Sequence, residues 1–138
     1  MLDLQRKSYI VEAELIGTTE IPPLKETFEQ LQNCGETFIG YYIDNKLAGA
    51  VSYKREAGTL DIHRVMVHPD FFRRGIAAKL IKHIEAHEKN TSKTIVSTGA
   101  ANLPAVRLYE KLGFLRQEDA IVGNEIVIAN FIKRNDIG

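Results

Sequence analysis

The residues with the clearest chemical potential lie between an apolar strand and a helix, in the segment Val65–Leu80. Arg73, Arg74 and Gly75 follow this strand, and helical periodicity begins directly after Gly75. A helix start leaves several backbone N–H groups without partners, at the positive end of the helix dipole. The two arginines add positive charge, and glycine has no Cβ that would keep a ligand from the backbone. The combination predicts a phosphate cradle, although a single glycine at a strand–helix turn also occurs for purely structural reasons.

Asp61 and His63 form a second group of polar side chains, in the strand before that cradle. Strict alternation along Thr59–Val67 places both on the same face as two valines. Ionisable and apolar residues rarely share one strand face. Either the strand leaves the core at its start, or a bulge near Arg64 shifts its register, and bulges are frequent beside active sites.

Asn102 and Tyr109 lie seven residues apart in a segment with helical periodicity. Asn102 suits an N-cap, since a proline follows in the first turn, and Gly113 suits the left-handed position that ends a helix. Because seven residues make two helical turns, both polar side chains lie on the same side of this helix. A tyrosine that merely packs against the neighbouring apolar residues is the alternative interpretation.

Periodicity predicts the elements that position these residues. Residues 2–16 favour an amphipathic helix, with a strand at Ser8–Leu15 as the competing interpretation, and Leu24–Gln32 favours a second helix. An apolar stripe along Ile76–Ile84 predicts the helix after the cradle. The crossovers between strands imply at least one parallel pair in an otherwise antiparallel sheet. The expected strands are Thr37–Ile43, Leu47–Tyr53, Thr59–Val67, Lys93–Thr98, Phe114–Asp119 and Glu125–Ile132, with Gly123-Asn124 as the last turn.

Composition narrows the class of protein. The 138 residues suffice for one hydrophobic core, so residues 1–138 are expected to form one domain. Eighteen basic residues balance eighteen acidic ones, which disfavours nucleic acid as a partner. Cys34 has no second cysteine for a disulfide or a metal site. We find no apolar run that could span a bilayer and no leader, and we therefore expect a cytoplasmic protein without a membrane partner.

Two segments together resemble the GNAT superfamily of acetyl-CoA-dependent N-acetyltransferases. Val67–Ala77 resembles the family's R/Q-x-x-G-x-G/A loop, and Asn102–Phe114 resembles its N-x-x-A-x-x-L-Y-x-x-x-G-F segment. The two motifs stand in the family's order, with a helix and a strand between them. The resemblance covers residues 36–133, and the first 35 residues only by helix order. It implies an α/β (α+β) domain with a mostly antiparallel mixed sheet, helices on both faces and a splayed parallel strand pair at the CoA site.

The resemblance also implies acetyl-CoA as co-substrate and an activity, the direct transfer of its acetyl group to a primary amine of a small molecule or peptide, without a metal. The pyrophosphate would lie on the loop and the helix start, and the main chain of Val65–Val67 would pair with the pantetheine arm. Asn102 would contact that arm, and Tyr109 would protonate the departing thiolate as general acid. The cofactor-binding residues so implied are Val65, Met66, Val67, Arg73, Arg74, Gly75, Ile76, Ala77, Ala78, Asn102 and Tyr109.

The general base stays open between two residues. Asp61 aligns with a strand position where some family members place a glutamate base, and His63 is the alternative; an exposed strand start without catalytic role would also explain both. The chain departs from the family at Phe72, where the loop's first Arg or Gln is missing, and at Ser97, where other members carry an acid. These departures support a rival function, a non-catalytic acyl-CoA-binding regulatory module. The sequence identifies neither the acceptor amine nor the oligomeric state, and leaves a homodimer through the last strand open.

Overall fold

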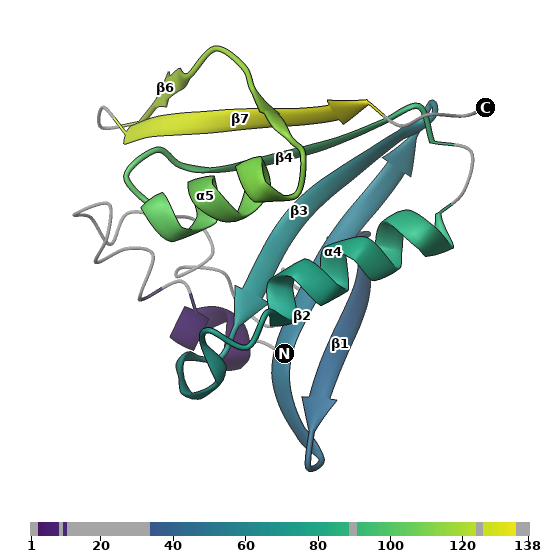
Figure 1. Cartoon of the computed structure of the whole chain (residues 1–138), viewed down its shortest axis with the longest axis vertical. Helices are drawn as coiled ribbons and strands as arrows, with labels where there is room; N and C mark the ends of the chain where they lie inside the picture. The colour runs from purple at the N-terminus through teal and green to yellow at the C-terminus, as the bar shows by residue number, and fades with distance from the viewer. Residues whose placement is uncertain (1–2, 9, 11–33, 89–90, 124–125, 135–138) are drawn as a thin grey trace.

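The computed structural model describes residues 3–8, 10, 34–88, 91–123 and 126–134, arranged around one twisted sheet (Figure 1). Six of the seven strands follow the order β1-β2-β3-β4-β7-β5, and the seventh, β6, also pairs with β7. Residues 3–8 and 10 are helical, which favours the helix over the strand in the described part of 2–16, whereas Leu24–Gln32 lies outside the described residues. The labelled elements are β1 (Thr37–Ile43), β2 (Lys46–Glu56), β3 (Thr59–Val67), the 3-10 turn η1 (Pro69–Phe71), α4 (Ile76–His87), β4 (Lys93–Gly99), α5 (Leu103–Lys111), β5 (Leu115–Arg116), β6 (Ala120–Val122) and β7 (Ile126–Arg134).

The parallel pair that the crossover predicted is formed by β3 and β4. The two strands pair only over their first residues, from Thr59 opposite Lys93 to Asp61 opposite Ile95. Both strands then continue but diverge, which opens a gap between their C-terminal halves (Figure 1). The other pairs among the described strands are antiparallel. The expected mixed sheet with a splayed parallel pair is therefore confirmed.

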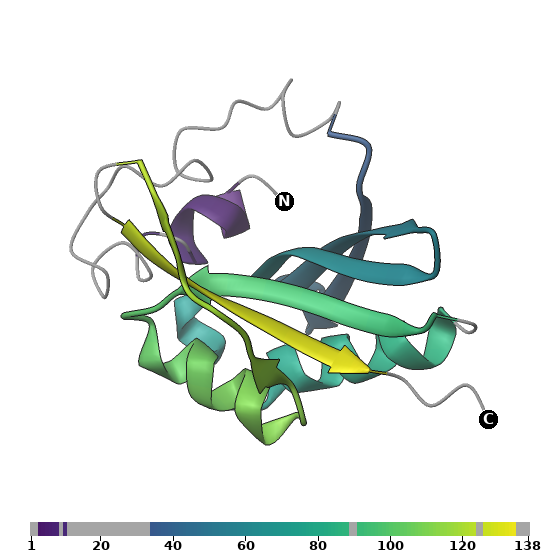
Figure 2. The same cartoon turned by 90° about the horizontal axis from the view of Figure 1, so that it is seen from above.

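Helices cover both faces of the sheet, as the sequence also indicated (Figure 2). On one face, α4 and α5 bury their apolar stripes in the main core. Close packing of α4 depends on Gly49 of β2, because a Cβ there would lie 2.7 Å from Cγ2 of Ile76. On the other face, the helix of residues 3–8 packs Leu4 against Ala50 and Met66. The sheet thus holds the start of α4 and the first helix on opposite sides of β3.

A bulge in β3 explains the mixed polarity of that strand. Arg64 is opposite Ser52 and Ile62 is opposite Tyr53, so His63 is the extra residue without a counterpart on β2. Before the bulge, Leu60 and Ile62 face the main core, and after it the valines at 65 and 67 do. The simple alternation that put Asp61 and His63 on the valine face is therefore wrong, and the alternative, a bulge near Arg64, is confirmed.

The C-terminal strands differ in their bounds from the prediction. The single strand expected at Phe114–Asp119 is wrong: two short strands, β5 and β6, flank residues 117–119 instead. Between them, the Asn130 side chain donates a hydrogen bond to the carbonyl of Glu118, and Arg116 pairs with Asp119. These local side-chain bonds compete with the regular ladder and break the strand.

Candidate active site

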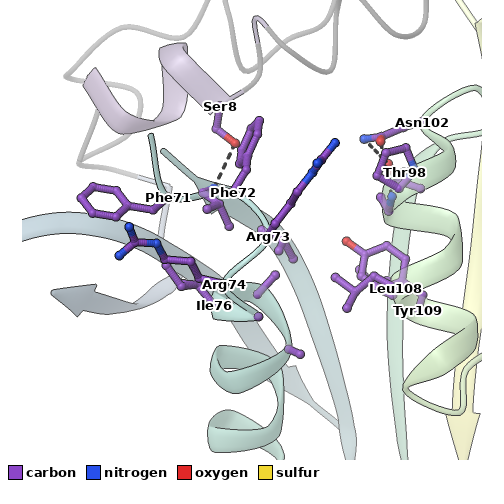
Figure 3. Close-up of a pocket in the computed structure, with 18 of the residues that line it drawn as sticks. Ser8, Phe71, Phe72, Arg73, Arg74, Ile76, Thr98, Asn102, Leu108 and Tyr109 are labelled. Carbon is purple, nitrogen blue, oxygen red and sulfur yellow. Dashed lines mark hydrogen bonds between the residues drawn. The ribbon is translucent and has the colours of Figure 1, made fainter. Parts of the chain in front are cut away.

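A cavity of about 590 Å³ lies where β3 and β4 diverge, and its walls come from the loop before α4 and from α5 (Figure 3). Most of the cofactor-binding residues that the sequence indicated meet there. The exception is Met66, which is fully buried on the other side of β3; of the two catalytic candidates, Tyr109 lines the cavity and Asp61 does not. The lining consists of Ser8, His63, Val65, Val67, residues 71–78, Val96, Ser97, Thr98, Asn102, Pro104, Ala105, Leu108 and Tyr109.

The loop before α4 presents unused backbone donors to this cavity. Gly75 is the N-cap of α4 with φ of 70°, in the left-handed region, and it has no side chain to bond the helix start. The first helical hydrogen bond joins the Lys79 N–H to the Gly75 carbonyl. The helix consequently supplies no partner for the N–H groups of residues 76–78, which lie at its positive end. A Cβ on Gly75 would meet no atom within 4 Å, so space beside the loop is open.

Two arginines flank these donors in different ways. The guanidinium of Arg74 lies over the ring of Phe71, 5.3 Å from its centroid. Arg73, with φ of 65°, extends its side chain across the cavity toward Asn102 (Figure 3). Phe72, which replaces the family's Arg or Gln, also lines the cavity and is 42% exposed. The mouth of the cavity therefore combines positive charge with an exposed aromatic ring.

The edge of β3 faces the gap with alternate residues. The His68 N–H donates to the Ala48 carbonyl on β2, whereas the Val67 N–H points the other way and donates to Oγ of Ser8 at 3.1 Å. Because main-chain groups alternate in direction along a strand, Val65 faces the gap with Val67, and Met66 faces β2. Two of the three residues at this edge thus direct main-chain groups into the gap, where Ser8 occupies the Val67 N–H.

The helix α5 places two polar side chains on the opposite wall. Asn102 caps the helix: its Oδ1 accepts from the Ala105 N–H, and its Nδ2 donates to Oγ1 of Thr98, both at 3.4 Å. Tyr109 is 3% exposed and packs edge-on against Phe114 and Phe131. Its hydroxyl is directed from α5 into the cavity (Figure 3). The aromatic packing holds the phenol ring so that only its polar end reaches the cavity.

The two candidates for the base touch each other. Nε2 of His63 lies 3.1 Å from Oδ2 of Asp61, and Nδ1 lies 3.6 Å from Oε2 of Glu36. His63 lines the cavity, whereas Asp61 does not. The bulge places the imidazole between two carboxylates at the edge of the gap, and Asp61 is connected to the cavity only by its contact with His63.

Glu36, which the sequence did not single out, anchors this corner. Its side chain is 6% exposed and accepts two hydrogen bonds from Arg64, at 2.8 and 3.0 Å, and one from Ser52. Burial alone would raise the pKa of the Glu36 carboxyl, but the hydrogen bonds of Arg64 and Ser52 and the arginine's charge lower it from 4.5 to about 2. Glu36 therefore stays ionised beside the imidazole at neutral pH.

Ser97 faces the gap from β4, where the resemblance left the family's acid missing. Its Oγ donates to Oδ1 of Asn130 at 2.7 Å, and Nδ2 of Asn130 donates to the Glu118 carbonyl. This series of hydrogen bonds fixes the direction of the serine proton, so the lone pairs of Ser97 can accept a hydrogen bond from a ligand. A serine so placed can orient a donor group but is a poor base.

Sequence reasoning missed part of the lining. Val96 and Thr98 could have been found by alternation along their strand, and Pro104, Ala105 and Leu108 by their spacing from Asn102. No local pattern marks Ser8 or Glu36, because both reach the site from segments distant in sequence.

The described residues hold neither a metal cluster nor a membrane-spanning helix. No group of three or more His, Cys, Asp or Glu residues there could hold a metal ion. In the same part of the chain, no helix is long and apolar enough to cross a membrane.

Comparison with known proteins places this geometry among acetyltransferases. The model of the acetyltransferase (GNAT) family matches residues 2–114. The UPF0157 protein YqkA of Bacillus subtilis is 37% identical over 131 residues, which cover 95% of this chain. The chain spans only 38% of that relative's length.

Solved structures with low sequence identity share the fold. An acetyltransferase from Thermus thermophilus superposes with a TM-score of 0.77 at 16% identity, covering 97% of this chain and 88% of that one. The PaiA N-acetyltransferase of Thermoplasma acidophilum, solved in complex with coenzyme A, gives 0.71 at 18% identity, covering 97% and 90%.

Proposed function

Because the chain belongs to the GNAT family of acetyltransferases, we propose that it binds acetyl-CoA in the cavity between β3 and β4 and transfers the acetyl group to a primary amine. One observation carries the proposal: a single cavity joins the unpaired N–H groups at the start of α4, the edge of β3 that diverges from β4 and the Tyr109 hydroxyl. The coenzyme A in the Thermoplasma relative supports the choice of ligand. The proposal treats residues 1–138 as one acetyltransferase domain, and the acceptor as a small molecule or a peptide.

The nucleotide end of acetyl-CoA lies on the loop before α4. Its pyrophosphate accepts hydrogen bonds from the N–H groups of Gly75–Ala78, and Arg73 and Arg74 add charge at the rim. The loss of the family's side chain at Phe72 removes one contact of many. Binding survives because backbone donors and the helix dipole supply most of the attraction.

The pantetheine arm lies in the gap and pairs with β3 like an added strand. Val65 and Val67 supply main-chain groups, while Met66 holds the strand on β2. Asn102 borders the arm from the opposite wall. This arrangement carries the thioester between β3, which bears His63, and α5, which bears Tyr109, and both of these residues line the cavity.

The acetyl group moves in one direct step without a covalent enzyme intermediate. A neutral amine attacks the thioester carbonyl, an N–C bond forms, and the C–S bond breaks. Tyr109 gives its proton to the departing sulfur. The ring packs against Phe114 and Phe131, which fixes the direction from which that proton arrives.

The amine's proton leaves through the pair of His63 and Asp61. The imidazole is the member that reaches the cavity: Nε2–H donates to Asp61 at 3.1 Å, so Nδ1 takes the proton, while Asp61 orients the ring and stabilises the charge it gains. Glu36 adds a fixed negative charge near Nδ1. Asp61 is thus assigned a role through the histidine or through water.

An acceptor screen tests the proposal. Free CoA thiol would be measured with acetyl-CoA and a panel of alkylamines, polyamines, aminoglycosides and peptides with free N-termini. We expect release with at least one class of amine. Acetyl-CoA binding in a calorimeter without turnover on any amine would instead favour the regulatory module, to which Phe72 and Ser97 point.

A further inference from the structure

The helix of residues 3–8 contacts β3 along the stretch that borders the cavity. Leu4 packs against Met66, and the fully buried Gln5 accepts a hydrogen bond from Nη1 of Arg64 at 2.8 Å. Ser8, one turn after Leu4, accepts the Val67 N–H through its Oγ. Three positions of one short helix thus dock on the last four residues of β3.

The Ser8 contact differs from the other two in its place. Leu4 and Gln5 lie on the face of β3 away from the cavity, whereas Ser8 lines the cavity itself. The N–H that it occupies is the last main-chain donor of β3 before the chain turns at His68, whose own N–H is used by β2. Ser8 therefore occupies the main-chain N–H that a ligand pairing with β3 as an added strand would need.

We propose that Ser8 is a built-in competitor for pantetheine, which holds the Val67 N–H in the free protein and must release it when CoA enters the gap. The inference rests on the proposed function, because it requires CoA in this cavity. A single N–H has one good acceptor direction, so a pantetheine carbonyl and the Ser8 hydroxyl exclude each other there.

The exchange lowers the affinity for any ligand with a pantetheine arm. Part of the new hydrogen bond only replaces the one that Ser8 gives up, and a net hydrogen bond corresponds to about a three- to tenfold change in affinity. Ligands that end at the nucleotide do not reach Val67 and escape this cost. Ser8 thereby sets how strongly the arm, as opposed to the nucleotide, contributes to binding.

Calorimetry on the full chain tests the competition with CoA and with adenosine 3′,5′-bisphosphate, which lacks the arm. Ser8→Ala should bind CoA about three- to tenfold more tightly than the wild type, with unchanged affinity for the bisphosphate. Ser92→Ala is the matched control, because Ser92 bonds the Gly58 carbonyl outside the cavity. Equal or weaker CoA binding by Ser8→Ala would overturn the inference. The absence of CoA binding in the wild type would instead refute the proposed function.

Hydrogen exchange at the Val67 amide gives a second readout that does not depend on affinity. In the free protein, Ser8→Ala should exchange this amide faster than the wild type. In the CoA complexes the two proteins should exchange it equally, because the ligand then holds the N–H in both. A faster rate in the Ser8→Ala complex would mean that Ser8 stays on Val67 with CoA bound, and would refute the competition.

Discussion

The two ends of the cavity are formed by different kinds of groups, main-chain groups at one end and side chains at the other. At the end near α4, the donors are main-chain N–H groups of consecutive residues, held by the helix that follows them. At the other end, His63, Asp61 and Glu36 meet only because a bulge in β3 and the segment before β1 bring their side chains together. One end depends on local backbone geometry, and the other on tertiary contacts.

This difference implies unequal tolerance to substitution. A backbone cradle keeps its N–H groups when a neighbouring side chain changes, which explains how Phe72 can stand at a position where relatives of the family carry Arg or Gln. It is vulnerable only where the backbone or the open space beside it changes. The end with His63 has no such reserve, because its geometry depends on side chains from distant segments, and a substitution there removes the group itself.

The largest effect is expected from Gly75→Glu, at the cradle. A carboxylate in the open space beside the loop repels the pyrophosphate, and the left-handed φ of 70° adds backbone strain. Acetyl-CoA affinity measured by calorimetry should fall by about 100-fold or more. Gly123→Glu is the control for strain, since Gly123 also has a left-handed φ, of 53°, and open space but does not line the cavity. Tight binding by the Gly75 variant would refute the cradle.

The next largest effect is expected from Tyr109→Phe. The aromatic packing is preserved, so only the proton donor is lost, and kcat should fall about 10- to 100-fold with little change in KM for acetyl-CoA. The rate would be followed by thiol release with an amine from the screen. Tyr42→Phe, at a site 65% exposed, should behave as the wild type. An unchanged kcat would remove Tyr109 from the mechanism.

His63→Gln and Asp61→Asn compare the two members of the base pair. If the imidazole takes the proton, we expect kcat to fall about tenfold or more in the histidine variant and by a smaller factor in the aspartate variant. The pH dependence of kcat/KM should change shape in both. A larger loss in Asp61→Asn would identify the carboxylate, acting through water, as the base.

Glu36, which lies beside His63, also contributes to the stability of the fold. Its pKa in the folded protein, about 2, lies below the ordinary 4.5, so its stabilisation is complete above about pH 4.5 and is lost as the pH falls toward 2. Denaturant unfolding of the wild type between pH 5 and 2 should show this loss of stability. Glu36→Gln removes the carboxylate charge that Arg64 contacts and should cost about 3 kcal/mol at pH 7. Its stability should then vary less between pH 5 and 2, and an equally steep dependence would contradict the assignment.

The smallest effect is expected from Phe72→Arg, which restores a residue of the family's motif. The position is exposed enough to accept the change, and the new charge near the phosphates should tighten acetyl-CoA binding about two- to fivefold. Phe72→Leu should leave the affinity nearly unchanged. A large gain in acetyl-CoA affinity would contradict the view that the backbone N–H groups supply most of the phosphate binding.

The difference between local backbone geometry and tertiary contacts also decides how much of the fold and the site the sequence could predict. The strand bounds at Thr37–Ile43 and Thr59–Val67, the cap at Asn102 and the helix start after Gly75 follow from local patterns, and the structure has them where they were expected. Their causes, alternation, capping and glycine geometry, act within a few residues. Features with such local causes can therefore be predicted from a short segment of the sequence.

The missed features depend on contacts between distant segments. Glu36 meets Arg64 across 28 positions, and Ser8 meets Val67 across 59, with no pattern at either partner. The break at residues 117–119 comes from Asn130, a residue of another strand. The mixed polarity of β3 indicated a bulge near Arg64 as one of two alternatives. That the bulge takes Asp61 off the face of the valines could be seen only from the pairing of β3 with β2.

The central claim, that CoA lies between β3 and β4 with its phosphates on the start of α4, is tested most directly by mapping backbone amide NMR shifts during a titration with CoA. We expect the largest changes at the amides of Val65 and Val67 and of residues 74–78, with little change at Met66, whose main chain faces β2. Dominant changes away from the cavity, or equal changes along residues 65–67, would contradict this assignment.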